Sequence, residues 1–377
     1  MNIIIAGDFC PHHRASVLIE EEKFAGLFSE VQSIVSGVDY AIVNFECPVV
    51  KGKEKPIEKQ GPSLRCSEKG MEVIKWVGFK CVTLANNHIL DYGRDGMKNT
   101  ICQCDKHSID YVGGGMNLTE ASKVLYKEIE GKKLAVVNSC EHEFSIATED
   151  TPGSNPLNPI QQYYFIKEAR QKADYVIVIV HGGIEHCQYP THRMVETYRF
   201  FVDAGADAVI NHHQHCPCGY EEYKGKPIFY GIGNFCFDWE GRQNSIWNQG
   251  YMVKLSLIDK SVFYEIIPYV QGDKNCGVRL MKENVKESFI LQLQNKSKTI
   301  EIASELDRAL KSFMTRHDFL YRKMLTPYTG RVATALFRRG LLPSFINKKR
   351  MLALSNFIKC ESHYERVCEL LDRLRQK

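Results

Sequence analysis

Five short motifs along the chain consist of residue types that bind divalent metals and transfer protons. In order, they are Gly7-Asp8, Asn44-Phe45-Glu46, Asn86-Asn87-His88, His181-Gly182-Gly183 and His212-His213-Gln214-His215. Carboxylate, amide and imidazole groups are common protein ligands of hard and borderline metal ions. Five such clusters, each beside a short apolar run, are difficult to explain by core packing. The pattern therefore indicates a two-metal hydrolytic site.

The apolar runs around these motifs predict the strands that must position them. The predicted strands are Ile3–Ala6, Tyr40–Val43, Cys81–Leu84, Leu134–Val137, Tyr175–Val180, Ala208–Ile210 and Ile228–Tyr230. Continuous apolar runs of this kind are typical of strands buried on both faces. Helical patterns between them predict helices at Ser67–Val77, Gly96–His107 and Met194–Ala204. Strands alternating with helices indicate an α/β fold, in which sites form at the carboxyl ends of strands.

The remaining segments have other patterns. Tyr251–Leu257 and Ser261–Tyr269 alternate polar and apolar residues, which predicts an antiparallel hairpin that closes a sheet. Thr148–Asn158 is rich in turn-forming residues and predicts a loop. From about residue 283 the pattern becomes helical, and Arg350–Leu374 again predicts helix. We therefore expect a domain over residues 1–275, followed by a helical C-terminal region over residues 276–377.

The stretches that carry the motifs resemble the CapA family of capsule and poly-γ-glutamate synthesis proteins. The matching stretches are IIIAGD, DYAIVNFECP, VTLANNHILDYG, VIVIVHGGIEH and DAGADAVINHHQHCPCGYEEYKGKPIFYGIGNFCFD. They cover roughly residues 1–270, and the NNHxxDxG, HGGxE, HxH and GNF blocks together are specific to the family. CapA proteins are a branch of the calcineurin-like metallophosphoesterases. The resemblance therefore implies a two-sheet sandwich flanked by helices, with metals at one edge.

The resemblance also implies ligands for two divalent metal ions, which would be Mn, Fe or Zn. The implied ligands are Asp8, Glu46, Asn87, His181, His213 and His215. Asp8 and His215 would bind the first metal, and His181 and His213 the second. Glu46 stands where the superfamily has an Asp that bridges the two metals, so Glu46 would take the bridging role.

One position departs from the superfamily pattern, which places a His two residues after the first Asp. Cys10 occupies that position here, and His12 and His13 follow shortly after it. Three interpretations are open. The first metal has fewer protein ligands, the Cys10 thiolate takes part, or one of the nearby His residues replaces the missing ligand.

Other residues of the motifs are implied to act beside the metals. His88 matches a His that protonates the leaving group or stabilises the transition state, a role that suits an imidazole near neutral pH. Asp91 would orient His88 or the start of the following helix. Glu185, His212 and Asn234 would contact the substrate or hold the metal ligands in place.

The composition of the chain is typical of a soluble protein and disfavours some classes of partner. The chain of 377 residues is 44% hydrophobic and 25% charged, as in ordinary soluble proteins with a large core. A net charge of +4 is small, so we expect no nucleic-acid partner. An apolar strand begins at Asn2, and no run of about eighteen apolar residues occurs. We therefore expect no signal peptide, and a cytoplasmic location with reduced thiols, either free or peripheral at the membrane.

The expected function is that of a metal-dependent hydrolase acting in capsule, polysaccharide or poly-γ-glutamate synthesis. Two metals would activate a water for attack on a phosphoester or an amide bond. The substrate would be a phosphoester or an anionic polymer. The main alternative is a non-catalytic subunit of a capsule synthesis system that binds polymer in the same pocket. A third is a scaffold that acts through the C-terminal helices.

The C-terminal region interleaves basic and apolar residues. The basic residues are Arg331, Arg338, Arg339, Lys348, Lys349 and Arg350, and the apolar ones are Leu336, Phe337, Leu341, Leu342 and Phe345. This mixture fits contact with an anionic membrane surface, an acidic polymer or a synthase. It also fits helices that pack on the catalytic domain with solvated basic faces. Packing would bury the apolar side chains, whereas docking would leave them exposed.

Overall fold

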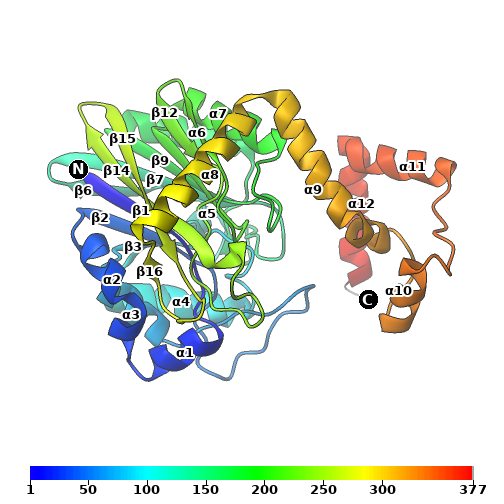
Figure 1. The fold of residues 1–377 in the computed structure, drawn as a ribbon, viewed down its shortest axis with the longest axis horizontal. Helices are drawn as coiled ribbons and strands as arrows, with labels where there is room; N and C mark the ends of the chain where they lie inside the picture. The colour runs from blue at the N-terminus through cyan, green and yellow to red at the C-terminus, as the bar shows by residue number, and fades with distance from the viewer. Residues whose placement is uncertain (376–377) are drawn as a thin grey trace. The chain divides into compact units, whose positions relative to one another are not determined.

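The computed structural model describes residues 1–375, and the chain divides into two compact units, Met1–Asp307 and a second unit that begins at Arg308. The first unit contains two large β-sheets with helices on their outer faces (Figure 1). The second unit is helical. No helix among the described residues is long and apolar enough to cross a membrane.

The first sheet combines parallel and antiparallel strands in the order β16-β15-β14-β1-β2-β3-β4. The bounds are β1 (Asn2–Phe9), β2 (Tyr40–Phe45), β3 (Cys81–Thr83), β4 (Asp110–Val112), β14 (Gln249–Ile258), β15 (Ser261–Val270) and β16 (Arg279–Leu280). Strands β1 to β4 run parallel, and β14 joins β1 antiparallel. A further strand, β13 (Asn234–Cys236), pairs with the end of β1.

The second sheet has the order β11-β12-β10-β9-β7-β6. Its strands are β6 (Leu125–Ile129), β7 (Lys132–Cys140), β9 (Tyr175–His181), β10 (Ala208–His212), β11 (Tyr220–Tyr223) and β12 (Lys226–Phe229). Strands β7, β9, β10 and β12 are parallel, and the two edge strands are antiparallel to their neighbours. A small ribbon pairs β5 (Gly114–Gly115) with β8 (Gly153–Ser154).

Successive side chains along a strand point to opposite faces of its sheet, so they pack in two different hydrophobic cores. In β1, Ile3 and Ile5 lie in the core between the two sheets, whereas Ile4 and Ala6 lie in the core beneath the outer helices. The helices on the first sheet are α1 (His13–Glu20), α2 (Phe24–Ser36), α3 (Lys69–Val77) and α4 (Gly93–His107). Those on the second are α6 (Pro159–Lys172) and α7 (His192–Ala204). Each buried aliphatic side chain stabilises this arrangement by roughly 1.5–3 kcal/mol.

The chain continues from the sheets into helices. Helix α8 (Glu283–Glu301) buries Phe289 and Leu293 in the core between the sheets, so it belongs to the first unit. A short α5 (Leu118–Ala121) and a 3₁₀ turn at Ile246–Asn248 complete that unit. The later helices are α9 (Ala303–Met324), α10 (Arg331–Arg338), α11 (Lys348–Lys359) and α12 (Glu361–Arg375).

The predicted fold class is confirmed, with a two-sheet α/β sandwich, flanking helices and C-terminal helices. The hairpin of β14 and β15 is also as predicted. One prediction was wrong in part, because the loop Thr148–Asn158 contains β8. There, Gly153 passes so close to the backbone that a Cβ would lie 2.3 Å from the Ser145 carbonyl oxygen. Glycine forms the strand at this position because only a residue without a side chain fits.

Gly7 occupies a second position of close backbone approach, at the end of β1. The amide of Asp8 donates to the Gly233 carbonyl oxygen at 3.2 Å, and a Cβ on Gly7 would lie 1.9 Å from that oxygen. We expect Gly7→Ala to lower the free energy of unfolding by about 3 kcal/mol, the upper range for overpacking a rigid site. Urea denaturation measures this.

The matched control is Gly26→Ala in α2, where a Cβ meets no atom within 4 Å. Alanine is the better helix former by roughly 1 kcal/mol, so this variant should be as stable as the parent or more so. Equal stability of the two alanine variants would contradict the role given to Gly7.

Candidate metal centre

The motif residues lie at the carboxyl ends of neighbouring parallel strands. In the first sheet, Asp8 of β1 is in register with Asn44 of β2, and Asn44 is in register with Thr83 of β3. In the second sheet, His181 at the end of β9 is in register with His212 at the end of β10. Because β1, β2 and β3 run parallel to one another, as do β9 and β10, the side chains that follow them gather at one edge of each sheet.

The chain after β10 has an unusual backbone that directs two imidazoles to the site. His213 has a φ of 85° and His215 a φ of 53°, both in the left-handed region. This region costs a non-glycine residue roughly 1–2 kcal/mol. Gln214, between them, donates from Nε2 to the Cys187 carbonyl oxygen at 2.7 Å, which anchors the turn. Backbone strain that the surroundings maintain is characteristic of functional sites.

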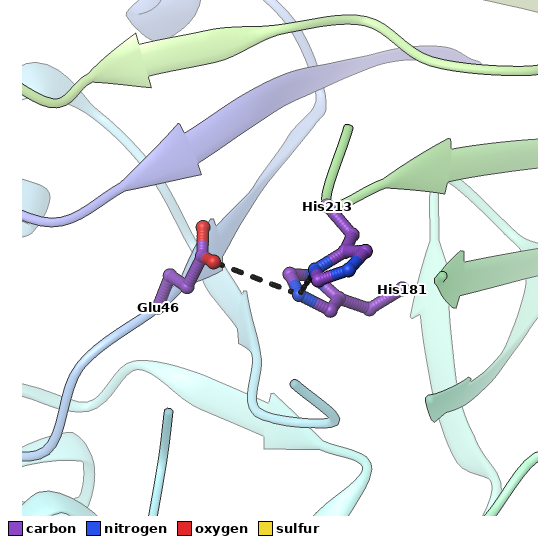
Figure 2. Close-up of side chains that lie close together, drawn as sticks. All are labelled: Glu46, His181 and His213. Atoms are coloured by element: carbon purple, nitrogen blue, oxygen red, sulfur yellow. Dashed lines mark hydrogen bonds and ion pairs between the residues drawn. The ribbon is translucent and has the colours of Figure 1, made fainter. Parts of the chain in front are cut away.

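One cluster of candidate ligands contains Glu46, His181 and His213, which converge in Figure 2. The Nε2 atom of His181 lies 3.6 Å from Glu46 Oε1 and 3.0 Å from His213 Nδ1. The Asn87 Oδ1 atom is 3.0 Å from the same Nε2. Three potential ligand atoms from separate strand ends and loops therefore lie close to the Nε2 atom of His181.

A second cluster contains Asp8, Glu46 and His215. His215 Nε2 lies 3.6 Å from Glu46 Oε1, and His215 Nδ1 lies 3.4 Å from Asp8 Oδ2. Within each cluster the potential ligand atoms are all within 4.8 Å of one another. Glu46 is the member that the two clusters share.

The donor set fits divalent cations. Glu46 is fully buried, yet neither of its oxygens accepts a hydrogen bond within the described part of the chain. A buried carboxylate without partners is costly, and a bound cation would supply the missing interaction. Oxygen and imidazole nitrogen ligands together suit Mn, Fe or Zn better than Ca or Mg.

The surroundings shift the pKa values of Glu46 and Asp8 in opposite directions. Burial, together with the charge of Asp8, holds the pKa of Glu46 well above its usual value. Burial also acts to raise the pKa of Asp8, but contacts with His212 and His215 outweigh it and hold that pKa well below normal. Burial and the neighbouring His213 hold the pKa of His181 well below normal, which keeps this imidazole in the neutral form that a metal requires.

Several other predicted residues orient these ligands. His212 Nδ1 lies 3.2 Å from Asp8 Oδ1. Asn234 Oδ1 lies 2.8 Å from His215 Nδ1, and its Nδ2 donates to the Trp247 carbonyl oxygen at 3.1 Å. Each contact fixes the direction of a side chain that the clusters use.

His88 and Asp91 form a unit beside the clusters. His88 Nδ1 lies 2.8 Å from Asp91 Oδ2, and the same oxygen accepts from the Leu64 amide at 2.6 Å. Burial holds the pKa of His88 below its usual value, although Asp91 opposes this effect. Asp91 therefore engages Nδ1 of this ring rather than Nε2.

Lys59 is a member of the site that the motifs do not indicate. Its side chain is 1% exposed, and its Nζ lies 2.5 Å from Asp91 Oδ1 and 3.0 Å from His88 Nδ1. Lys59 lies in a charged segment without regular structure. Neither periodicity nor a motif could have distinguished it from the exposed lysines nearby.

Glu143 and Asn44 were also not assigned roles from the sequence. Glu143 accepts from Asn87 Nδ2 at 2.9 Å, and its Oε1 lies 3.5 Å from His213 Nε2. Asn44 donates to Asp8 Oδ1 at 2.7 Å, and it lies 3.2 Å from His181 Nδ1. Asn44 therefore connects a residue of each cluster. The position of Asn44 in the second motif was the one feature of the sequence that could have indicated its role.

Three residues considered from the sequence lie outside both clusters. Cys10 is buried, and burial raises the pKa of its thiol to about 11. His12 stacks on Trp239 with ring centroids 4.7 Å apart. The carboxylate of Glu185 is half exposed, and its contact of 4.0 Å is with His186. Glu143, by contrast, lies 3.5 Å from a ring nitrogen of His213.

The chain is similar in sequence to biosynthesis proteins from two Bacillus species. The chain is 31% identical over 246 residues to the capsule biosynthesis protein CapA of Bacillus anthracis, covering 63% of this chain and 60% of that one. It is 32% identical over 253 residues to the PGA biosynthesis protein CapA of Bacillus subtilis (strain 168), covering 66% and 67%. The chain thus spans about 60% of the length of the first of these relatives.

A solved phosphatase structure from Mycoplasma pneumoniae is similar with a TM-score of 0.45 at 17% identity, covering 73% of this chain and 95% of that one. The model of the bacterial capsule synthesis protein family PGA_cap matches residues 2–239. That match takes in every one of the five motifs, and with it the strand ends that carry both ligand clusters. The chain therefore belongs to the PGA_cap family of bacterial capsule synthesis proteins.

Proposed function

We propose that this protein is a metal-dependent hydrolase that binds two divalent cations. The observation that supports the proposal most strongly is the shared position of Glu46, which is buried, lacks hydrogen-bond partners in the described chain and belongs to both ligand clusters. A carboxylate with only a structural role would accept hydrogen bonds from its surroundings. A carboxylate between two cations would not need them.

The ligand roles follow the two clusters. Asp8 and His215 would hold one cation, His181 and His213 the other, and Glu46 both. Asn87 would add its amide oxygen on the side of His181. When bound, the cations would supply an activated water and stabilise negative charge in the transition state.

His88 would act on the leaving group. Asp91 holds its Nδ1 atom at 2.8 Å, which fixes the ring and directs Nε2 toward bound substrate. Lys59 and the Leu64 amide hold Asp91 in turn. An imidazole oriented in this way can donate a proton to a departing oxygen or nitrogen. The ligands themselves do not select between a phosphoester and an amide bond.

Membership of the family supports the substrate class that we propose. The similar Bacillus proteins are described as acting in capsule and PGA biosynthesis. We propose a phosphoester or polyglutamyl amide substrate connected with an anionic polymer. The test is to assay the purified protein with added Mn²⁺ on bis(p-nitrophenyl) phosphate and on poly-γ-glutamate, with and without a chelator. Turnover that the chelator abolishes is expected. Bound metal without turnover on either substrate would instead favour a polymer-binding subunit.

Lys59 gives a further test of this arrangement. Replacing one member of a buried ion pair leaves the other charge uncompensated, at a cost of about 3–5 kcal/mol. We expect Lys59→Gln to lower the free energy of unfolding by about 3 kcal/mol, because Asp91 keeps its contacts with His88 and the Leu64 amide. The turnover number should fall as well, with metal content unchanged. Lys53→Gln, an exposed lysine of the same loop, should change neither quantity. Parental stability in the Lys59 variant would contradict the buried pair.

A further inference from the structure

The second unit is strongly basic, although the chain as a whole is nearly neutral. From Arg308 onward the sequence has sixteen Lys and Arg against five Asp and Glu, a net charge of +11, whereas the whole chain carries +4. The charge is concentrated further in residues 331–359, which we term the basic segment. It contains seven Lys and Arg and no Asp or Glu. Its charge therefore favours an anionic partner.

The basic segment also exposes large apolar side chains. Among the described residues, they are Val332 (75% exposed), Leu341 (66%), Phe345 (55%), Met351 (52%), Leu352 (64%), Phe357 (43%) and Ile358 (65%). Helix α11, coloured red-orange in Figure 1, buries none of its residues. Met351 and Ile358 are seven residues apart and so share one face of this helix. Apolar side chains interleaved with cations and left exposed indicate an interaction surface.

The backbone that carries these side chains is held in place within the second unit. Phe337 is buried, and its ring lies 5.5 Å from Tyr328 and 6.0 Å from Phe319. The Tyr328 hydroxyl donates to the Pro343 carbonyl oxygen at 2.8 Å. The side chain of Asn347 caps α11 by accepting from the Arg350 amide at 2.9 Å. These contacts hold α10, α11 and the segment between them, which together carry the exposed residues.

We propose that the basic segment docks on an anionic membrane surface. Cations alone would suffice to bind an acidic polymer, and exposed Leu, Ile, Met and Phe side chains would add nothing to that contact. A membrane interface uses both kinds of residue, because the cations approach anionic headgroups while the apolar side chains enter the acyl boundary. This inference is independent of the metal centre.

Co-sedimentation of the full chain with vesicles tests the proposal. The expected result is binding to vesicles of phosphatidylcholine with 30 mol% phosphatidylglycerol, weaker binding at high salt, and none to pure phosphatidylcholine. The triple variant Lys348→Gln, Lys349→Gln, Arg350→Gln should bind about a hundred-fold more weakly, since each cation near an anionic surface contributes about five-fold. Neutralising three exposed lysines of the first unit, Lys98, Lys106 and Lys123, should leave binding unchanged.

A second variant separates a membrane from an acidic polymer. Met351→Ser with Ile358→Ser keeps every charge, so it should lose vesicle binding by at least ten-fold while it retains any binding to soluble poly-γ-glutamate. Circular dichroism checks that both multiple variants keep the helical content of the parent. No vesicle binding by the parent at low salt would overturn the proposal. Vesicle binding that the apolar replacements leave unchanged would also overturn it.

Discussion

Removing the imidazole of His213 is expected to empty one of the two proposed cation positions and to abolish most turnover. His213 Nδ1 lies 3.0 Å from His181 Nε2, and these two residues with Glu46 form one complete cluster. Without His213, two members of that cluster remain. A metal ion contributes several kcal/mol of transition-state stabilisation, so the turnover number of His213→Ala should fall about 10³-fold or more.

Metal content and turnover are measured on the same preparation, by mass spectrometry of the metals and by the phosphodiester assay. His192→Ala is the matched control, because His192 is an exposed imidazole on α7 that pairs with Asp307 at 2.7 Å. This control should match the parent in both measurements. Parental metal content in His213→Ala would remove His213 from the ligand set.

Replacing His88 is expected to leave the metal content unchanged and to lower the turnover number. His88 contacts Asp91 and Lys59 and lies in neither ligand cluster. A positioned general acid contributes about 10²–10⁴-fold to the rate. His88→Ala should therefore lose about that factor in the turnover number, with both cations still bound.

Asp91→Asn complements this test, because it preserves the shape of Asp91 and removes the charge that His88 faces. It should lower the turnover number less than His88→Ala does, and it should also leave metal content unchanged. Loss of metal from His88→Ala would show that His88 is a ligand. A parental turnover number in His88→Ala would remove it from the chemistry.

The strands could be predicted from the sequence because their apolar runs are continuous. Tyr175–His181 and Ala208–His212 are buried at every position, since one face meets the other sheet and the opposite face meets helices. Helix α6 could not be predicted in the same way. It buries only Gln162, Ile166 and Ala169, so it lacks a clear apolar face. A few contacts with the sheet hold such a helix in place, even though its sequence has no strong periodic pattern of apolar residues.

The candidate site could be predicted where residues follow strands, and not where they come from loops. Asp8, Glu46 and His181 end or follow apolar runs, so topology brings each of them to the carboxyl-terminal edge of its own sheet. Glu143 and Lys59 reach the site from irregular segments, and their positions depend on tertiary contacts with Asn87 and Asp91. Such contacts leave no periodic signal in a sequence, and a charged loop residue has the same local pattern whether it is buried or exposed.

Anomalous diffraction from Mn²⁺-soaked crystals tests the central claim most directly. The arrangement of the two clusters predicts two anomalous peaks, about 3.5–4 Å apart as in other two-metal sites, with the Glu46 carboxylate between them. One peak should lie beside His181 and His213, and the other beside Asp8 and His215. A single peak, or two peaks that both lie away from Glu46, would contradict the bridged two-metal centre and with it the proposed hydrolase.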